Sequence, residues 1–240
     1  MTSLSLTGVR GGVGVSALLA AIGHALERLG ERVLLVDLCP ENMLRLHFNV
    51  DASHTGGWAR AMLEGQDWFE QAWSLTPTLH LLPYGTVSAA QSDALEQRLR
   101  NEPSLWARRQ KSLNAHYDWI LFDVPQRLPG HAILGPCLFP IQVIEADVAC
   151  QILLHQQARD SLLLVNRFDP GSQLQRDLLL LWRNHHATRI LPLAIHLDEA
   201  MREALAYKQP LGQYAPDSLA AHDVLSLATW CLTRRRGERS

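Results

Sequence analysis

A glycine-rich segment near the start of the chain places the strongest constraint on its fold. Residues 3–9 (SLSLTGV) form a β-type run, and residues 16–29 carry hydrophobic side chains at helical spacing. Gly11, Gly12 and Gly14 lie between them. Glycines there let backbone N–H groups turn inward around an anion, and the start of the following helix attracts the same anion. This order predicts a phosphate-binding loop; a tight turn without a ligand is the alternative.

The rest of the chain alternates between strand-type and helix-type segments. Near-continuous apolar runs are typical of buried parallel strands, and such runs occur at residues 32–37, 79–85, 119–125, 138–146 and 161–167. Helical patterns cover residues 147–158, 172–186 and 217–232, and the charged stretch 86–116 is also expected to be helical. The alternation predicts an α/β fold: a single domain over residues 1–240, with a mostly parallel sheet and helices on both faces.

Composition excludes several classes of protein. Hydrophobic residues make up 47% of the 240 residues and charged residues 19%, which favours a packed core over disorder. The net charge of -2 argues against a broad nucleic-acid surface. The four cysteines show no C-x-x-C pair, so neither a zinc site nor an iron–sulfur site is expected. No signal-peptide pattern and no apolar stretch of about 18 to 20 residues is present, and we expect a cytoplasmic protein.

Two strand-type runs end in an acidic residue. Asp37 follows the glycine loop at a spacing that also suits a ribose-binding Asp, but the loop reads G-G-x-G and not G-x-G-x-x-G. Asp123 follows four apolar residues, a position that holds Mg²⁺ through water in P-loop proteins; capping a turn is the alternative. Ser16 occupies the position whose hydroxyl meets Mg²⁺.

These segments together resemble the deviant Walker A family of ATPases, which includes MinD, ParA and the nitrogenase iron protein. That family's loop reads K-G-G-x-G-K-[ST], and residues 10–16 read RGGVGVS. Residues 33–42 (VLLVDLCPEN) resemble switch I, residues 119–125 (WILFDVP) resemble Walker B and switch II, and residues 198–232 resemble the C-terminal region. Residues 162–168 (LLLVNRF) resemble the strand whose Asn and Arg approach the adenine.

The resemblance implies that residues 1–240 form a single P-loop NTPase domain of the MinD/ParA-like type. It also implies a site for ATP and Mg²⁺, with no residue assigned a catalytic role. Its expected members are Arg10, Gly11, Gly12, Val13, Gly14, Val15, Ser16, Ala17, Asp37, Asp123, Asn166 and Arg167, with Ser16 and Asp123 at the Mg²⁺ ion, Asp123 through water.

Three positions depart from the family pattern. Val15 replaces the P-loop Lys, Arg10 replaces the Lys that reaches the partner's nucleotide, and Cys39 replaces a switch I Asp linked to the attacking water. Losing one charge-assisted phosphate contact costs about 1.5 to 3 kcal/mol, so binding survives at weakened affinity, helped by the planar fork of Arg10. A thiol is a poor hydrogen-bond acceptor, so turnover suffers more. We expect an ATP-binding protein whose hydrolysis is slow or absent.

Further segments narrow the resemblance to BcsQ (YhjQ), the accessory ATPase family of bacterial cellulose secretion. They include LRLHFNVD, GWARAMLEGQDW (57–68) and LPLAIHLDEAM. The resemblance implies a homodimer that joins the cellulose synthase through partners such as BcsR and BcsE, recruited to the inner membrane by them without direct insertion and without nucleic acid. Alternatives are a ParA/MinD-type positioning ATPase with partner-stimulated hydrolysis and an iron–sulfur carrier, which the lack of paired cysteines disfavours.

Two further features carry structural expectations. Trp58, Trp68 and Trp73 lie in an amphipathic stretch, where they either pack between helices or form a partner-binding surface. The tail RRRGERS (234–240) is expected to be a frayed, solvated terminus.

Overall fold

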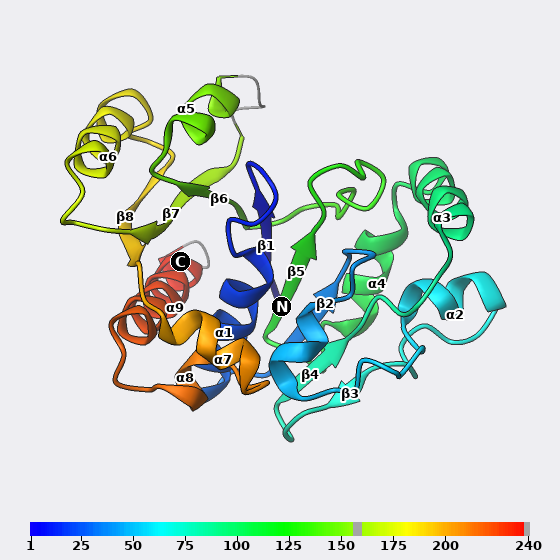
Figure 1. The fold of residues 1–240 in the computed structure, drawn as a ribbon. Coiled ribbons are helices and arrows are strands. Elements are labelled where there is room, and N and C mark those ends of the chain that lie inside the picture. The colour runs from blue at the N-terminus through cyan, green and yellow to red at the C-terminus, as the bar shows by residue number, and fades with distance from the viewer. Residues whose placement is uncertain (156–159, 238–240) are drawn as a thin grey trace.

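The protein folds around one mixed sheet, seen in a computed structural model that describes residues 1–155 and 160–237 (Figure 1). Within these residues the sheet has eight strands in the order β3-β4-β2-β5-β1-β6-β7-β8. The strands are β1 (Thr2–Gly8), β2 (Val33–Asp37), β3 (Trp73–Ser74), β4 (Leu79–Leu82), β5 (Trp119–Val124), β6 (Phe139–Glu145), β7 (Leu162–Phe168) and β8 (Ile190–His196). The pair β3–β4 is antiparallel and the other pairs are parallel. The predicted mostly parallel α/β fold is confirmed.

Helices lie in most of the connections between the strands, as the alternating pattern predicts. They are α1 (Val15–Arg28), the short 3₁₀ helix η1 (Leu44–Phe48), α2 (Trp58–Glu64), α3 (Ala89–Asn101), α4 (Leu105–Leu113), α5 (Val148–Leu154), α6 (Gln173–His185), α7 (Ala200–Ala206), α8 (Leu211–Tyr214) and α9 (Leu219–Gly237). Gly30, with φ +88°, follows the end of α1 in the left-handed conformation that glycine adopts freely. The helix expected over 147–158 is described as far as Leu154, and positions 156–159 lie outside the described residues.

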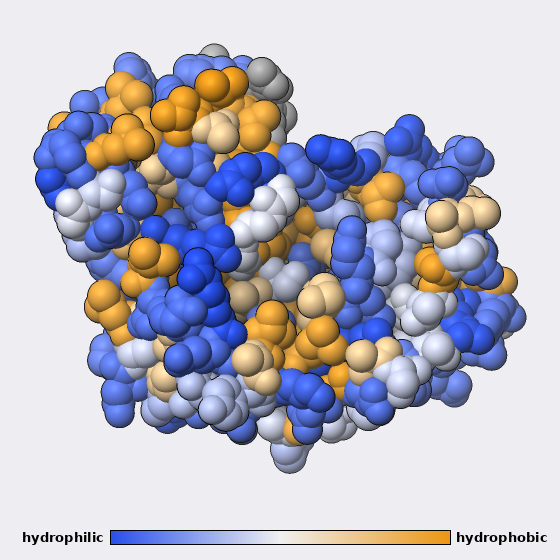
Figure 2. All heavy atoms as spheres, viewed as in Figure 1, coloured by the Kyte–Doolittle hydropathy of each residue, from blue (hydrophilic) through white to orange (hydrophobic). Residues whose placement is uncertain are grey.

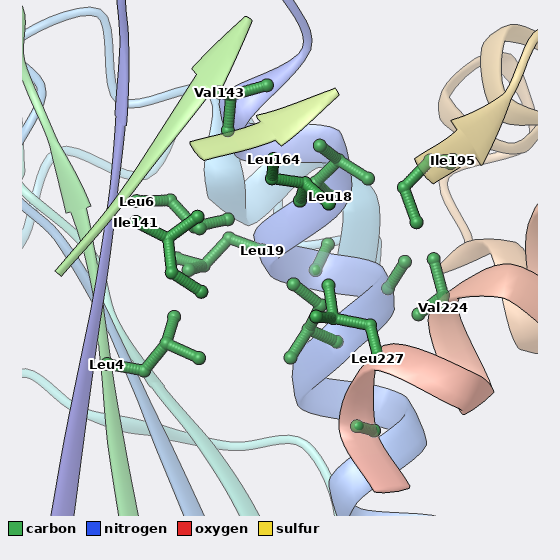
Figure 3. Packing of buried hydrophobic residues seen from close by; sticks show 14 of the residues in the cluster. Leu4, Leu6, Leu18, Leu19, Ile141, Val143, Leu164, Ile195, Val224 and Leu227 are labelled. Carbon is green, nitrogen blue, oxygen red and sulfur yellow. The ribbon is translucent and has the colours of Figure 1, made fainter. Parts of the chain in front are cut away.

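The central strands are buried on both faces because helices cover both sides of the sheet. Along β2, Val33 and Leu35 belong to one hydrophobic cluster, whereas Leu34 and Val36 belong to another. Alternate side chains of a strand point to opposite faces, so the two clusters lie on opposite sides of the sheet. In the first cluster, side chains of α1 and α9 meet those of β1, β6 and β7 (Figure 3).

The second cluster packs α2, α3 and α4 against β2, β4 and β5. Trp58 and Trp106 are fully buried in it, and the guanidinium of Arg109 lies over the rings of Trp58, Trp68 and Trp106. Trp58 and Trp68 therefore pack between helices, whereas Trp73 remains 36% exposed at the sheet edge.

The structure departs from the sequence expectations at three places. The strand expected over 79–85 ends at Leu82. The edge strand β8 was not predicted, since Pro192 interrupts its pattern and only some of its side chains are buried; a sheet edge tolerates proline. The expectation of a frayed tail is wrong for residues 234–237, which continue α9. Arg235 is buried there, and it is held by two hydrogen bonds to Glu31 at 2.6 and 2.7 Å.

Hydrophobic side chains are exposed on two helices that flank the carboxyl ends of β6 and β7. Figure 2 shows them gathering over α5 and α6. They include Val148, Ile152, Leu174 and Leu180, each more than half exposed. Among the described residues, no helix combines the length and the apolar character that crossing a membrane requires.

Candidate functional site

The glycine-rich loop lies in the middle of the sheet. It joins the end of β1 at Gly8 to the start of α1 at Val15, and β1 has β5 on one side and β6 on the other. The chain leaves β1 toward one edge of the sheet and leaves β6 toward the other. Ligands of open α/β sheets bind in the crevice that such a reversal creates at the carboxyl ends of the strands. The loop therefore occupies the position where this fold places a ligand.

Two side chains from the end of β7 hold the outer side of the loop. Asn166 Nδ2 donates to the carbonyl oxygen of Val13 at 2.8 Å, and the Arg167 guanidinium donates to that of Gly12, also at 2.8 Å. Gly14 has φ +90°, and a Cβ there would lie 2.7 Å from Asn166 Nδ2. These contacts engage two carbonyl groups of the loop, and the free N–H groups at the start of a helix such as α1 are the donors that bind anions.

The same two residues line a cavity of about 110 Å³ beside the loop. Its other walls come from Gly14 and Ala17 on one side and from the β8–α7 segment on the other. The cavity-lining residues of the β8–α7 segment are His196, Leu197, Asp198, Met201, Arg202 and Leu205. The sequence predicts that Asn166 and Arg167 lie next to the adenine of a bound nucleotide. In the structure both residues line this cavity, and both also hold the loop through hydrogen bonds to its carbonyl groups.

Asp37 is the last residue of β2 and Asp123 the last but one of the neighbouring strand β5, and the two residues are paired in register. Both carboxylates are buried, at 0% and 1% exposure. Asp37 accepts hydrogen bonds from the backbone N–H groups of Cys39 at 2.9 Å and Leu44 at 3.1 Å. Burial, and then the neighbouring Asp123, raise the pKa of Asp37 well above its usual value. Burial raises the pKa of Asp123 to about 6, against the opposing effect of Ser16 and Cys39.

Cys39 lies against the Asp123 carboxylate as a hydrogen-bond donor. Its Sγ is 3.3 Å from Asp123 Oδ1, and Oδ2 of the same carboxylate is buried without a hydrogen-bond partner among the described residues. Burial, followed by the charges of Asp123 and Asp37, raises the pKa of the Cys39 thiol, so the thiol keeps its proton. At this position the chain offers a donor where an Asp would offer an acceptor.

Arg10 is held within its own chain by two carboxylates. Its Nη2 atom pairs with Glu145 and with Asp147, the latter at 2.7 Å. Glu145 also binds Arg167 at 2.6 Å, so one carboxylate joins Arg10 of the loop to the β7 arginine that holds Gly12. The hydrogen bond to Asp147, then the charge of Glu145, raise the pKa of Arg10. Arg10 is thus anchored and not simply solvated.

The other predicted loop residues differ in how deeply they are buried. Val13 is buried, and Val15 packs against the core at the position where other P-loops carry Lys. Gly11 is exposed, with open space around it. Ser16, the second residue of α1, lies beside Asp123 and lowers the pKa of that carboxyl.

Sequence reasoning missed several residues of this site. Gln126 donates to the carbonyl oxygen of Val9 at 2.7 Å, and Glu145 and Asp147 hold Arg10. The acid that ends a strand-type run is the signal that identified Asp37 and Asp123, and it applies equally to Glu145 at the end of β6. The ion pairs of Arg10 depend on this third acidic strand end.

A strand-loop-helix anion site, with two buried acids on adjacent strand ends, defines a P-loop protein of the MinD/ParA class. Solved structures share the fold. MinD from Pyrococcus horikoshii complexed with Mg-ADP aligns with a TM-score of 0.71 at 20% identity over 95% of this chain and 94% of that chain. Cobyrinic acid a,c-diamide synthase from Mycobacterium smegmatis, with a bound ATP analogue and magnesium, gives 0.73 at 19% identity over 97% and 94%.

Sequence comparison narrows the class to one family. The family model for cellulose biosynthesis protein BcsQ matches residues 1–232. BcsQ of Escherichia coli K12 is 43% identical, covering 99% of this chain and 96% of the relative, and that of Salmonella typhimurium is 42% identical over 100% and 98%. The chromosome-partitioning ATPase Soj of Thermus thermophilus is 25% identical over 96% and 95%. The chain belongs to the BcsQ family.

Proposed function

We propose that this chain is an accessory ATP-binding protein of bacterial cellulose synthesis and secretion, acting as a nucleotide-dependent dimeric switch. Residues 1–240 work in it as one MinD/ParA-like unit. The observation that carries the proposal is the composition of the site. The phosphate loop is braced and has Asp123 beside it, yet the neighbouring switch I position holds Cys39, whose thiol donates to that carboxylate. Such a site binds ATP and turns it over slowly.

The residues present fit a magnesium nucleotide. Asp123 Oδ2 is buried and has no hydrogen-bond partner among the described residues, which suits the water shell of a cation. Ser16 and Asp123 would hold Mg²⁺, the latter through water. The loop amides would bind the phosphates, and Arg167 beside the loop and Arg10 of a second copy would supply the positive charge that Val15 lacks. When bound, Mg²⁺ neutralises charge on the phosphate oxygens.

The role of Arg10 in dimerisation depends on releasing its two ion pairs. To reach the nucleotide of a second copy, the guanidinium must exchange Glu145 and Asp147 for phosphate oxygens. Two phosphate oxygens can accept a bidentate pair of hydrogen bonds from the planar guanidinium and carry a higher charge than a carboxylate, so the exchange is favoured only when ATP is present. The ion pairs thus oppose dimerisation of the empty protein and make it depend on nucleotide.

Family membership supplies the cellular context of the proposal. BcsQ relatives are named for cellulose biosynthesis, and MinD has been solved in complex with its partner MinC. We infer that this chain acts in the cytoplasm on partners such as BcsR and BcsE and through them on the cellulose synthase at the inner membrane. No nucleic acid and no direct membrane insertion are required.

The first test is the identity and amount of nucleotide released when freshly purified protein is denatured. We expect intact ATP in a stoichiometric amount and slow steady-state phosphate release, because Cys39 cannot accept a hydrogen bond from an attacking water as Asp does. An empty protein that also rejects added Mg-ATP would contradict the proposal. Rapid phosphate release that partner proteins stimulate would favour the alternative function, a ParA/MinD-type positioning ATPase.

The dimer is tested on the same preparation by light scattering with and without ATP. Arg10→Ala should weaken the nucleotide-linked dimer, whereas Arg60→Ala, which removes another ion-paired arginine on α2, should leave it intact. If Arg10→Ala dimerises to the same extent as wild type at every ATP concentration, Arg10 does not contribute to the dimer interface.

A further inference from the structure

Three side chains of ligand type meet where β2 and β5 end. Asp37, Cys39 and Asp123 each place one ligand atom so that all lie within 4.8 Å of one another. Asp37 and Asp123 are paired in register on β2 and β5, which fixes their separation, and Cys39 follows two residues after the end of β2 with its backbone N–H bound to Asp37. The cluster is therefore part of the rigid frame of the molecule and not an accident of flexible surface side chains.

A second observation indicates that the cluster accommodates a cation. Asp37 and Asp123 are 0% and 1% exposed, and the described part of the chain provides no basic side chain hydrogen-bonded to either. Asp123 Oδ2 is buried without a hydrogen-bond partner among these residues. Two buried carboxylates side by side are costly unless a proton or a cation offsets their charge. The unpaired oxygen gives such a cation a point of attachment.

The donor set determines which cation fits. Two carboxylate oxygens alone suit Mg²⁺, but a sulfur ligand favours borderline and soft ions such as Zn²⁺, Co²⁺ and Cd²⁺. Zinc–sulfur and zinc–oxygen bonds of ordinary length place the two ligand atoms of a tetrahedral site roughly 3.5 Å apart. Cys39 Sγ and Asp123 Oδ1 are 3.3 Å apart without any rearrangement.

The surroundings of Asp37 also favour coordination. Each of its oxygens accepts one backbone N–H, from Cys39 and from Leu44, and each keeps a further lone pair. Hydrogen bonds of this kind orient a ligating carboxylate and restrict its motion. A metal ligand is thus held in place before any ion binds.

We propose that Asp37, Cys39 and Asp123 form a direct binding site for a zinc-class divalent ion, with Cys39 as a thiolate ligand. Binding replaces the S–H bond of Cys39 by a sulfur–metal bond and releases the proton to solvent. Three protein ligands leave a fourth, open position. The ion shares Asp123 with the Mg²⁺ of the proposed nucleotide site, so a zinc-class ion opposes Mg-ATP binding. The site itself does not depend on nucleotide, and a protein that binds no ATP would still bind this ion.

The test uses Co²⁺ added to full-length protein that has been freed of divalent ions and nucleotide with a chelator. Wild type should develop the sulfur-to-cobalt charge-transfer absorption that reports a thiolate ligand. Cys39→Ser should lose it. Cys137→Ser should keep it, because Cys137 is likewise half-buried but lies beside Ser3 and Ser5. No band in wild type, a band retained in Cys39→Ser, or a band lost in Cys137→Ser would each overturn the proposal.

Competition distinguishes this site from an ordinary magnesium site. Zn²⁺ should displace Co²⁺ at stoichiometric concentration, and Asp123→Asn should lower Co²⁺ affinity by at least about tenfold. Mg²⁺ in large excess should displace Co²⁺ only weakly. Displacement by Mg²⁺ as effective as that by Zn²⁺ would show that the sulfur is not a ligand. Circular dichroism of each variant confirms that the sheet has formed.

Discussion

Gly14 shows how one residue of the loop is fixed from a distant part of the chain. Its φ of +90° is unfavourable for any residue with a Cβ, and that Cβ would lie 2.7 Å from Asn166 Nδ2. Gly14→Ala should therefore lower the free energy of unfolding by about 1 to 3 kcal/mol, measured by urea denaturation. Gly11→Ala is the matched control, since nothing lies within 4 Å of a Cβ added there and its φ lies outside the left-handed region. Equal stability of the two variants would contradict this account.

At this scale the sequence predicts which residues form the loop but not what each one contacts. The glycine spacing identifies Gly11, Gly12 and Gly14 as a group, because backbone conformation is a local property. The difference between Gly11 and Gly14 comes from Asn166, more than 150 positions away, and only the pairing of β6 with β7 brings Asn166 to the loop. The ion pairs of Arg10 arise in the same way, from the ends of strands that are remote in sequence.

Among the elements, α3 anchors the loop that follows β5. The Glu96 carboxylate accepts the backbone N–H of Gly130 at 2.7 Å and lies 2.7 Å from Nδ1 of the fully buried His131. The other ring nitrogen of His131 lies 3.0 Å from the Tyr84 hydroxyl, so helix, loop and strand end share one buried network. A glutamate on the buried side of α3 breaks the hydrophobic periodicity, which explains why the sequence predicts helix over 86–116 without indicating its boundaries or its inner face.

Removing Glu96 should be costly because its partners are left buried and unpaired. Glu96→Ala should lower the free energy of unfolding by about 1 to 3 kcal/mol for each unpaired group, Gly130 N–H and His131 Nδ1. Glu102→Ala removes a solvent-exposed ion pair with Arg108 and should change stability by less than about 1 kcal/mol. Urea denaturation of both variants measures the difference, and similar losses in the two would show that the Glu96 network adds nothing to a surface ion pair.

For the molecule as a whole, local sequence patterns predict the sheet and the helix layers that cover it. Contacts between distant segments determine the order of the strands and how the C-terminal helix packs. Alternating strand and helix segments are enough to predict a parallel sheet covered on both faces. The order of the strands and the edge strand β8 were not predicted, because both depend on pairing between distant segments. The end of α9 is held to the rest of the fold by Arg235. This residue binds Glu31, and its guanidinium lies 5.0 Å from the ring centre of Trp119. A run of three arginines suggests a solvated tail, but the middle arginine, Arg235, is buried against the core.

The stability of the whole fold should depend on pH through His47, which is 4% exposed within η1. Burial lowers the pKa of His47 to about 4, below the usual 6.5. Between these values the unfolded chain binds a proton that the folded chain does not, so stability falls as pH drops from about 6.5 to about 4, by at most about 1.4 kcal/mol per pH unit. The raised pKa of the Asp37 carboxyl acts in the opposite direction, but wild type and a His47→Gln variant share that contribution. Urea denaturation across this range should therefore give a shallower loss of stability in acid for His47→Gln than for wild type, and parallel profiles would show that His47 is protonated in the folded protein.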